Sequence, residues 1–73
     1  MSYGEKAVGL SFNPSADPVV EEIKSGYAKL IDRMDAIRND PDNSSEKKRL
    51  ASIAITEAQT AQMWAVKAWT WKD

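Results

Sequence analysis

Alanines recur along one helical stripe in the second half of the chain. The stripe keeps intervals of three and four residues and consists of Ala51, Ala54, Ala58, Ala61, Ala65 and Ala68. This spacing predicts a helix over about residues 45–70, with a seam of small side chains that lets another helix approach closely. Trp64, Val66 and other large apolar residues occupy the remaining sides. Because a helix that is apolar nearly all round needs several partner surfaces, we expect other copies of the chain to supply some of them.

Large apolar residues follow the same spacing in the first half of the chain, at Val20, Ile23, Tyr27, Leu30, Met34 and Ile37. They predict a helix over about residues 18–38, which Asp17 caps and Pro18 opens. Pro41 ends it, and the short loop at 39–44 makes the two helices antiparallel neighbours. The sequence therefore predicts an all-α fold: an antiparallel two-helix hairpin whose large side chains pack against the alanines.

A short arm, residues 1–13, precedes the hairpin domain at 14–73, and its Gly4 and Gly9 indicate a loose backbone. A chain of 73 residues has a marginal core, so we expect the hairpins to assemble into a compact homo-oligomer. The antiparallel geometry places the start of the first helix beside the end of the second. It brings Phe12, Asn13, Lys24 and Ser25 near Thr60, Trp64, Lys67 and Trp71.

Composition narrows the classes of function. The chain has no cysteine and no histidine, so it lacks disulfides, thiolate metal sites and the commonest general base. We expect no enzyme, no metal and no cofactor. The 10 basic and 11 acidic residues give a net charge of −1, which does not suit a partner such as DNA or RNA. No signal-peptide pattern or membrane-length apolar segment is present, so we expect no membrane contact.

The Lys24-Ser25-Gly26 segment is the first candidate binding site. A glycine inside a helix costs about 1 kcal/mol relative to alanine, and it is tolerated where a backbone or a ligand comes close. The lysine and the hydroxyl beside it suit a phosphate oxygen. The alternative is that Gly26 only permits close helix packing and that Lys24 is solvated.

Aromatic side chains are the second candidate. Tyr3, Phe12 and Trp71 offer faces on which a purine can stack. The alternative, favoured for the tryptophans, is that they close the open end of the hairpin or fill a subunit interface. Phe12 precedes a turn outside the helices, and for this residue both interpretations stay open.

Polar residues of the second helix complete the candidates. Lys67 and Glu57 lie in apolar surroundings, so pairing between subunits is their expected role. Thr56 offers a hydroxyl to a ligand, with a bond back to its own helix as the alternative. Arg49 belongs to a basic run that is either an anion site or a solvated helix start, balanced by an acidic neighbour such as Glu46.

Several segments resemble a known family, the phage anti-CBASS and anti-Thoeris cyclic-nucleotide sponges. Three segments are similar to the first helix of that hairpin domain: residues 13–15 (NPS), the pattern of Val, Ile and Lys at 20–24, and residues 30–32 (LID). Residues 54–71 (AITEAQTAQMWAVKAWTW) resemble its second helix, and the MWAVKA run is the most specific part. The resemblance covers about residues 11–71.

This resemblance implies a hairpin that assembles into a compact oligomer, typically a hexamer, in the cytoplasm of the infected bacterial host. Such proteins bind cyclic oligonucleotide second messengers without cleaving them and thereby block anti-phage signalling. Their ligands are cyclic dinucleotides, cyclic trinucleotides in separate pockets and, for some relatives, signals of the cyclic ADP-ribose type.

The resemblance also implies roles for single residues. An aromatic residue of the arm stacks on the base and a lysine of the first helix meets the phosphate, and Phe12 and Lys24 match these positions. Asn13 is placed to contact a ligand edge. Phe12 stands where a tyrosine is expected, so a hydroxyl contact is missing. Arg49 and Lys67 are the candidates for the basic residue of the trinucleotide pocket. The alternative function is a structural or protein-interaction oligomer without a small-molecule ligand.

Overall fold

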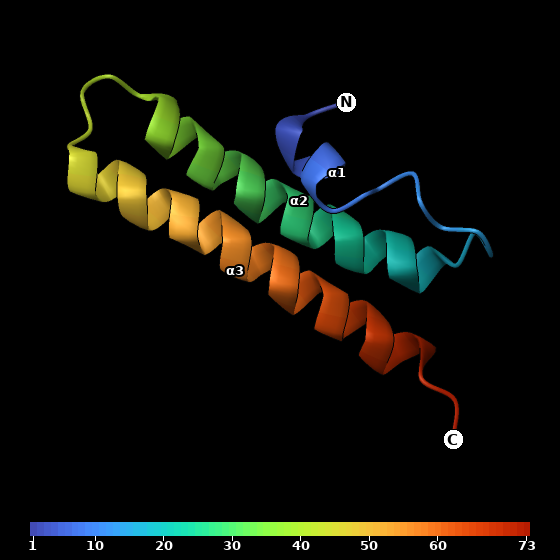
Figure 1. Cartoon of the computed structure of the whole chain (residues 1–73). Coiled ribbons are helices and arrows are strands. Elements are labelled where there is room, and N and C mark those ends of the chain that lie inside the picture. The colour runs from blue at the N-terminus through green and yellow to red at the C-terminus, as the bar shows by residue number, and fades with distance from the viewer.

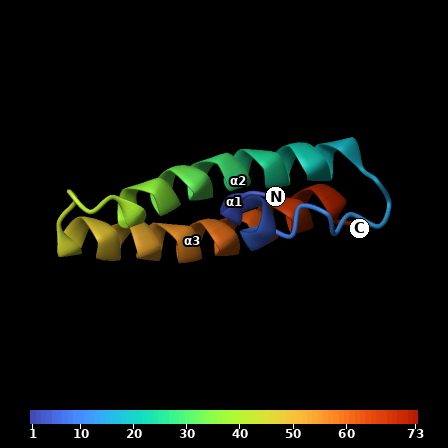
Figure 2. The same cartoon turned by 90° about the horizontal axis from the view of Figure 1, so that it is seen from above.

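Three α-helices and no strands make up the computed structural model, which describes all 73 residues. The helices are α1 (Tyr3–Ala7), α2 (Pro18–Asn39) and α3 (Ser45–Thr70). α2 and α3 form an antiparallel hairpin, and α1 packs against α2, which gives a flat molecule of 46 × 24 × 13 Å (Figures 1 and 2). The predicted helical hairpin is confirmed, and both long helices begin and end within one residue of their expected ranges.

Side-chain caps set the ends of the long helices. One carboxylate oxygen of Asp17 accepts from the backbone N–H groups of Val19 and Val20 at 2.8 and 3.4 Å, directly before Pro18. The Ser44 hydroxyl accepts from the N–H of Lys47 at 3.2 Å and so begins α3. These bonds satisfy backbone donors that a helix leaves free at its start, which is why the sequence located both helices well.

The hydrophobic core differs from the predicted seam between two helices. Its central cluster is Val8, Ala28, Ile31 and Ile55, so the arm contributes to it. Leu30, expected inside, is 58% exposed, and Ala51 is the only buried member of the alanine stripe. The reason is that the arm covers a neighbouring face of α2, which turns the centre of the core away from the expected stripe.

The arm is not loose, contrary to the expectation from its glycines. α1 has a capping box between Ser2 and Glu5, and Gly4 is buried. A Cβ atom at Gly4 would lie 2.1 Å from the carbonyl oxygen of Ala28, so the absence of a side chain allows α1 to touch α2. The Gly4 N–H donates to Asp32 Oδ1 at 2.6 Å.

A second contact ties the end of α1 to α3. Gln59 Nε2 donates to the carbonyl oxygen of Ala7 at 3.1 Å. The arm is thus bonded to both long helices, and it reaches the start of α2 in a fixed position. None of the three helices is both long enough and apolar enough to cross a membrane.

Candidate ligand-binding site

Lys24 is the only buried cation of the protein, with 6% of its surface exposed. Its ammonium donates to the backbone carbonyl oxygens of Gly9 and Phe12, at 3.0 and 2.5 Å. An ammonium has three donors, so these bonds leave one free. The two ion pairs of the protein join Arg38 to Asp35 and Arg49 to Glu46, so no carboxylate neutralises Lys24. Lys24 is therefore not the solvated lysine of the alternative interpretation, and it lacks a counter-charge.

Phe12 lies beside this ammonium. Lys24 Nζ is 5.6 Å from the centroid of the Phe12 ring, within the range of a cation–π contact, and the ring is 74% exposed. Both residues line a pocket of about 140 Å³ at the open end of the hairpin. The rest of its lining is Asn13 of the arm, Pro14 and Ser15 of the turn before α2, Val20 of α2, and Val66 and Thr70 of α3. The structure therefore brings Phe12, Asn13 and Lys24 together.

The Asn13 amide holds the turn between the arm and α2. Asn13 Nδ2 donates to the carbonyl oxygen of Asp17 at 2.9 Å, and Asn13 Oδ1 accepts from the Asp17 N–H at 3.2 Å. Ala16, inside this turn, has a φ of 52°, a left-handed conformation that a residue with a side chain seldom adopts. Contact of Asn13 with a ligand edge stays a prediction, because both ends of its amide already have partners within the chain.

The residues of the Lys24-Ser25-Gly26 segment do not line one common binding site. Successive side chains of a helix point about 100° apart, and the three residues border different surfaces. Ser25 lines a polar depression beside α1, together with Glu5 and Asp32. A Cβ at Gly26 would meet nothing within 4 Å, so the helix packing offered as the alternative explanation is absent from the single chain.

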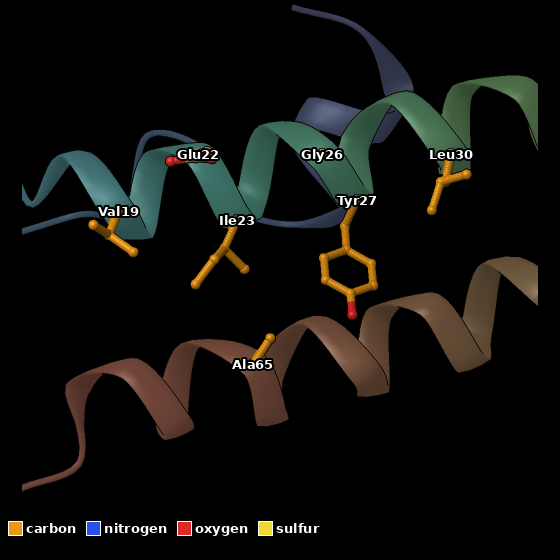
Figure 3. A pocket seen from close by; sticks show the side chains of 7 residues that line it. All are labelled: Val19, Glu22, Ile23, Gly26, Tyr27, Leu30 and Ala65. Atoms are coloured by element: carbon orange, nitrogen blue, oxygen red, sulfur yellow. The ribbon is translucent and has the colours of Figure 1, made fainter.

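Gly26 borders an apolar groove of about 400 Å³ between α2 and α3. Figure 3 shows Val19, Ile23, Tyr27 and Leu30 directed from α2 towards α3, from which Ala65 points back. Glu22 is the only charged residue of the lining. The groove therefore suits an apolar partner and not a phosphate.

The remaining candidates lie outside the Phe12–Lys24 pocket. Arg49 lies near the start of α3, at the loop end of the hairpin, and pairs with Glu46 at 2.6 Å, which raises the pKa of its guanidinium. Thr56 donates back to the carbonyl oxygen of Ser52 at 3.4 Å, as its alternative interpretation holds. Lys67 Nζ lies over the ring of Trp64, at 5.1 Å from its centroid.

The α3 neighbours of the pocket differ from the expected ones. Sequence reasoning placed Trp64 and Lys67 beside Phe12, whereas the structure places Val66 and Thr70 there. The shift has the same cause as the displaced core, because the arm lies against a different side of the hairpin. Tyr3, a candidate for stacking, lies instead against the guanidinium of Arg38, whose Cζ is 5.0 Å from the ring centroid.

Trp69 joins the last turns of α3 to the cap of α2. Its Nε1 donates to Asp17 Oδ2 at 3.0 Å. This bond is the main reason that the pKa of the Asp17 carboxyl lies below its ordinary value, and the backbone bond from Val19 adds to it. Because the folded pKa is the lower one, the contact stabilises the fold above the ordinary pKa and is lost as the pH falls through the folded pKa.

Replacing Trp69 with phenylalanine is expected to raise the pKa of Asp17 towards its ordinary value, since the ring remains and the N–H donor is lost. A carboxyl titration followed by NMR measures the change. Trp64→Phe is the matched control, because the Trp64 ring does not contact Asp17. An Asp17 titration curve that is the same in Trp69→Phe and in the unmodified protein would contradict the assignment.

The fold and the pocket together define a class of protein: a small helical hairpin with a buried, uncompensated lysine and an exposed aromatic ring at its open end. The family described as Acb2/Tad1, hairpin domain, matches residues 5–70, and the chain belongs to that family. It is the anti-CBASS and anti-Thoeris sponge family, so the resemblance noted in the sequence is confirmed. No curated protein and no solved structure matches the chain.

Proposed function

We propose that the protein is a non-catalytic sponge that sequesters cyclic oligonucleotide immune messengers in the cytoplasm of the infected bacterial host. The observation that carries the proposal is the Lys24 ammonium, which is buried, has no carboxylate partner and keeps one donor free beside the exposed Phe12 ring. A buried charge favours an opposite charge nearby, and an exposed aromatic ring favours a base. A cyclic oligonucleotide supplies a phosphate and a purine within one molecule.

A second copy of the chain completes the site in this proposal. The pocket of about 140 Å³ in one chain is smaller than the roughly 300–1,000 Å³ of ordinary small-molecule sites. A symmetric cyclic dinucleotide fits a two-fold axis on which each protomer offers the same Phe12 and Lys24. We propose a homo-oligomer, with a hexamer as the expected state. Arg49 and Lys67 stay the candidates for a separate pocket that takes cyclic trinucleotides.

Recovery of the ligand tests sequestration. The purified protein is mixed with a panel of cyclic dinucleotides and trinucleotides and a cyclic ADP-ribose isomer, separated from free ligand and denatured. We expect intact ligand in the released fraction, and a linear product would contradict a sponge. Phe12→Ala, which removes an exposed ring, is expected to reduce affinity by about 1–3 kcal/mol per stacked base without lowering the melting temperature of the free protein.

The apolar groove between α2 and α3 favours a second candidate, a scaffold that binds another protein and no small molecule. Thermal melting separates the two functions. A ligand present at 100 times its Kd adds about 2.7 kcal/mol to the free energy of unfolding, which gives a clear rise in melting temperature. A panel in which no cyclic nucleotide moves the transition would favour the scaffold.

A further inference from the structure

One face of α3 carries a regular pattern that neither α1 nor α2 covers. Its members, called the outer seam below, recur at intervals of three and four residues: Leu50, Ile53, Glu57, Thr60, Trp64 and Lys67 of α3, and Trp71, the C-cap residue that follows the helix. All are exposed, and the large apolar members Leu50, Ile53, Trp64 and Trp71 are 52, 44, 65 and 64% exposed. A repeat of 3.5 residues is the pattern by which one helix packs along another, so the occupant that fits this face is a helix.

The charged members of the outer seam have no partners of opposite charge within the chain. The two ion pairs of the protein involve neither Glu57 nor Lys67. Lys67 Nζ lies between aromatic rings, 5.1 Å from the centroid of Trp64 and 5.9 Å from that of Trp71. Glu57 and Lys67 are about 15 Å apart along the helix axis, too far to pair with each other. The seam thus offers one acid and one base at fixed separation on an apolar strip.

We propose that the outer seam binds the same seam of a second copy in antiparallel orientation. In this register each Glu57 faces the partner's Lys67, and the two-fold axis repeats the pair. The same register sets Ile53 against the partner's Trp71, which buries exposed apolar surface. The proposal rests on the self-association included in the proposed function, and it specifies which faces meet and in which direction.

Charge decides the direction of the two helices. A parallel pairing in register places Glu57 beside the partner's Glu57 and Lys67 beside the partner's Lys67, which is repulsive at both positions. The antiparallel register turns both contacts into attractive pairs. The Trp64 and Trp71 rings can keep their contact with Lys67 while its ammonium faces the partner, and large aromatic residues are the usual anchors of such interfaces.

Charge reversal tests the pairing. In sedimentation experiments we expect Glu57→Lys alone, and Lys67→Glu alone, to weaken self-association at least tenfold, because each places like charges together twice per dimer. The double variant is expected to restore association to within about threefold of the unmodified protein. Asp42→Lys and Lys29→Glu change the net charge equally at exposed positions outside the seam, and they are expected to leave association unchanged. Circular dichroism verifies that each variant is folded.

Cross-linking tests the direction, and the chain has no cysteine of its own to interfere. An oxidised mixture of Ile53→Cys protein with Trp71→Cys protein is expected to give a disulfide-linked dimer of one chain of each kind. Ile53→Cys alone is expected to give none, and a dimer from it would overturn the antiparallel register. The seam would also be overturned if the single reversals left association intact. It would be overturned as well if the double variant associated as weakly as the single variants.

Messenger binding by the same samples separates this inference from the proposed function. If the reversal variants associate as the unmodified protein does and release intact ligand, the antiparallel seam is wrong. The proposed sequestration of messengers is then unaffected. An unmodified protein that sediments as a monomer overturns the seam together with self-association, whatever ligand it binds.

Discussion

Replacing Gly4 with alanine is expected to separate α1 from the hairpin. The new Cβ would lie 2.1 Å from the carbonyl oxygen of Ala28 and 2.8 Å from Asp32 Oδ1. The first of these atoms belongs to the backbone of a long helix and cannot move aside, so α1 has to shift and lose its bond to Asp32. Overpacking a well-filled site costs about 1–3 kcal/mol, and we expect a loss of stability at the upper end of that range.

Gly26→Ala is the matched control for this substitution. It adds the same atom to α2 at a position where nothing lies within 4 Å, and alanine is favoured over glycine inside a helix by about 1 kcal/mol. The two variants are therefore expected to change stability in opposite directions. Urea unfolding followed by circular dichroism measures both, and limited proteolysis reports release of the arm. A Gly4→Ala protein as stable and as protease-resistant as the unmodified chain would refute the close contact.

Replacing Lys24 with methionine is expected to cause the largest loss of ligand affinity. Methionine keeps the apolar stem and removes the ammonium, so under the proposed function a ligand phosphate loses the only buried cation of the chain. A hydrogen bond to a charged group contributes about 1.5–3 kcal/mol, which corresponds to a loss of roughly 10- to 150-fold in affinity. The carbonyl oxygens of Gly9 and Phe12 also lose a donor, although the cost of burying a charge disappears with it.

Lys29→Met is the control, because Lys29 is an exposed lysine of the same helix and has no bond to the arm. Isothermal titration with a cyclic dinucleotide gives the affinities, and sedimentation shows whether the oligomer survives. Retained assembly with weak binding assigns Lys24 to the ligand. An oligomer that dissociates in Lys24→Met would make the residue structural, and equal affinity in both variants would exclude it from the site.

The sequence located the long helices well because the residues at their starts form caps with neighbouring backbone groups. Asp17, Pro18 and Ser44 form caps that need no knowledge of the rest of the fold. α1 was missed because a helix of five residues is too short to produce a periodic pattern. Without α1 the core was centred on a hairpin of two helices, which is why Leu30 was expected inside and Ile31 was not.

The proximity of two candidate residues was predictable from the sequence, and the bonding of Lys24 was not. Phe12 and Lys24 were chosen from residue type and resemblance, and they lie together in the structure. The partners of the Lys24 ammonium are backbone carbonyl oxygens, which every residue possesses, so the sequence gives no sign of them. Val66 and Thr70 were missed because α3 is apolar on most sides, and the pattern alone does not tell which side meets the arm.

The flat shape of the molecule makes its stability depend on its own concentration. Only 9 of the 73 residues are buried, and the thinnest dimension is 13 Å, so a lone chain has little interior to hold it together. Under the proposed self-association, each chain gains stability from its neighbours by mass action. Under the proposed function, the few copies present early in infection are therefore the least stable ones, and the number of folded binding sites rises more steeply than the number of chains.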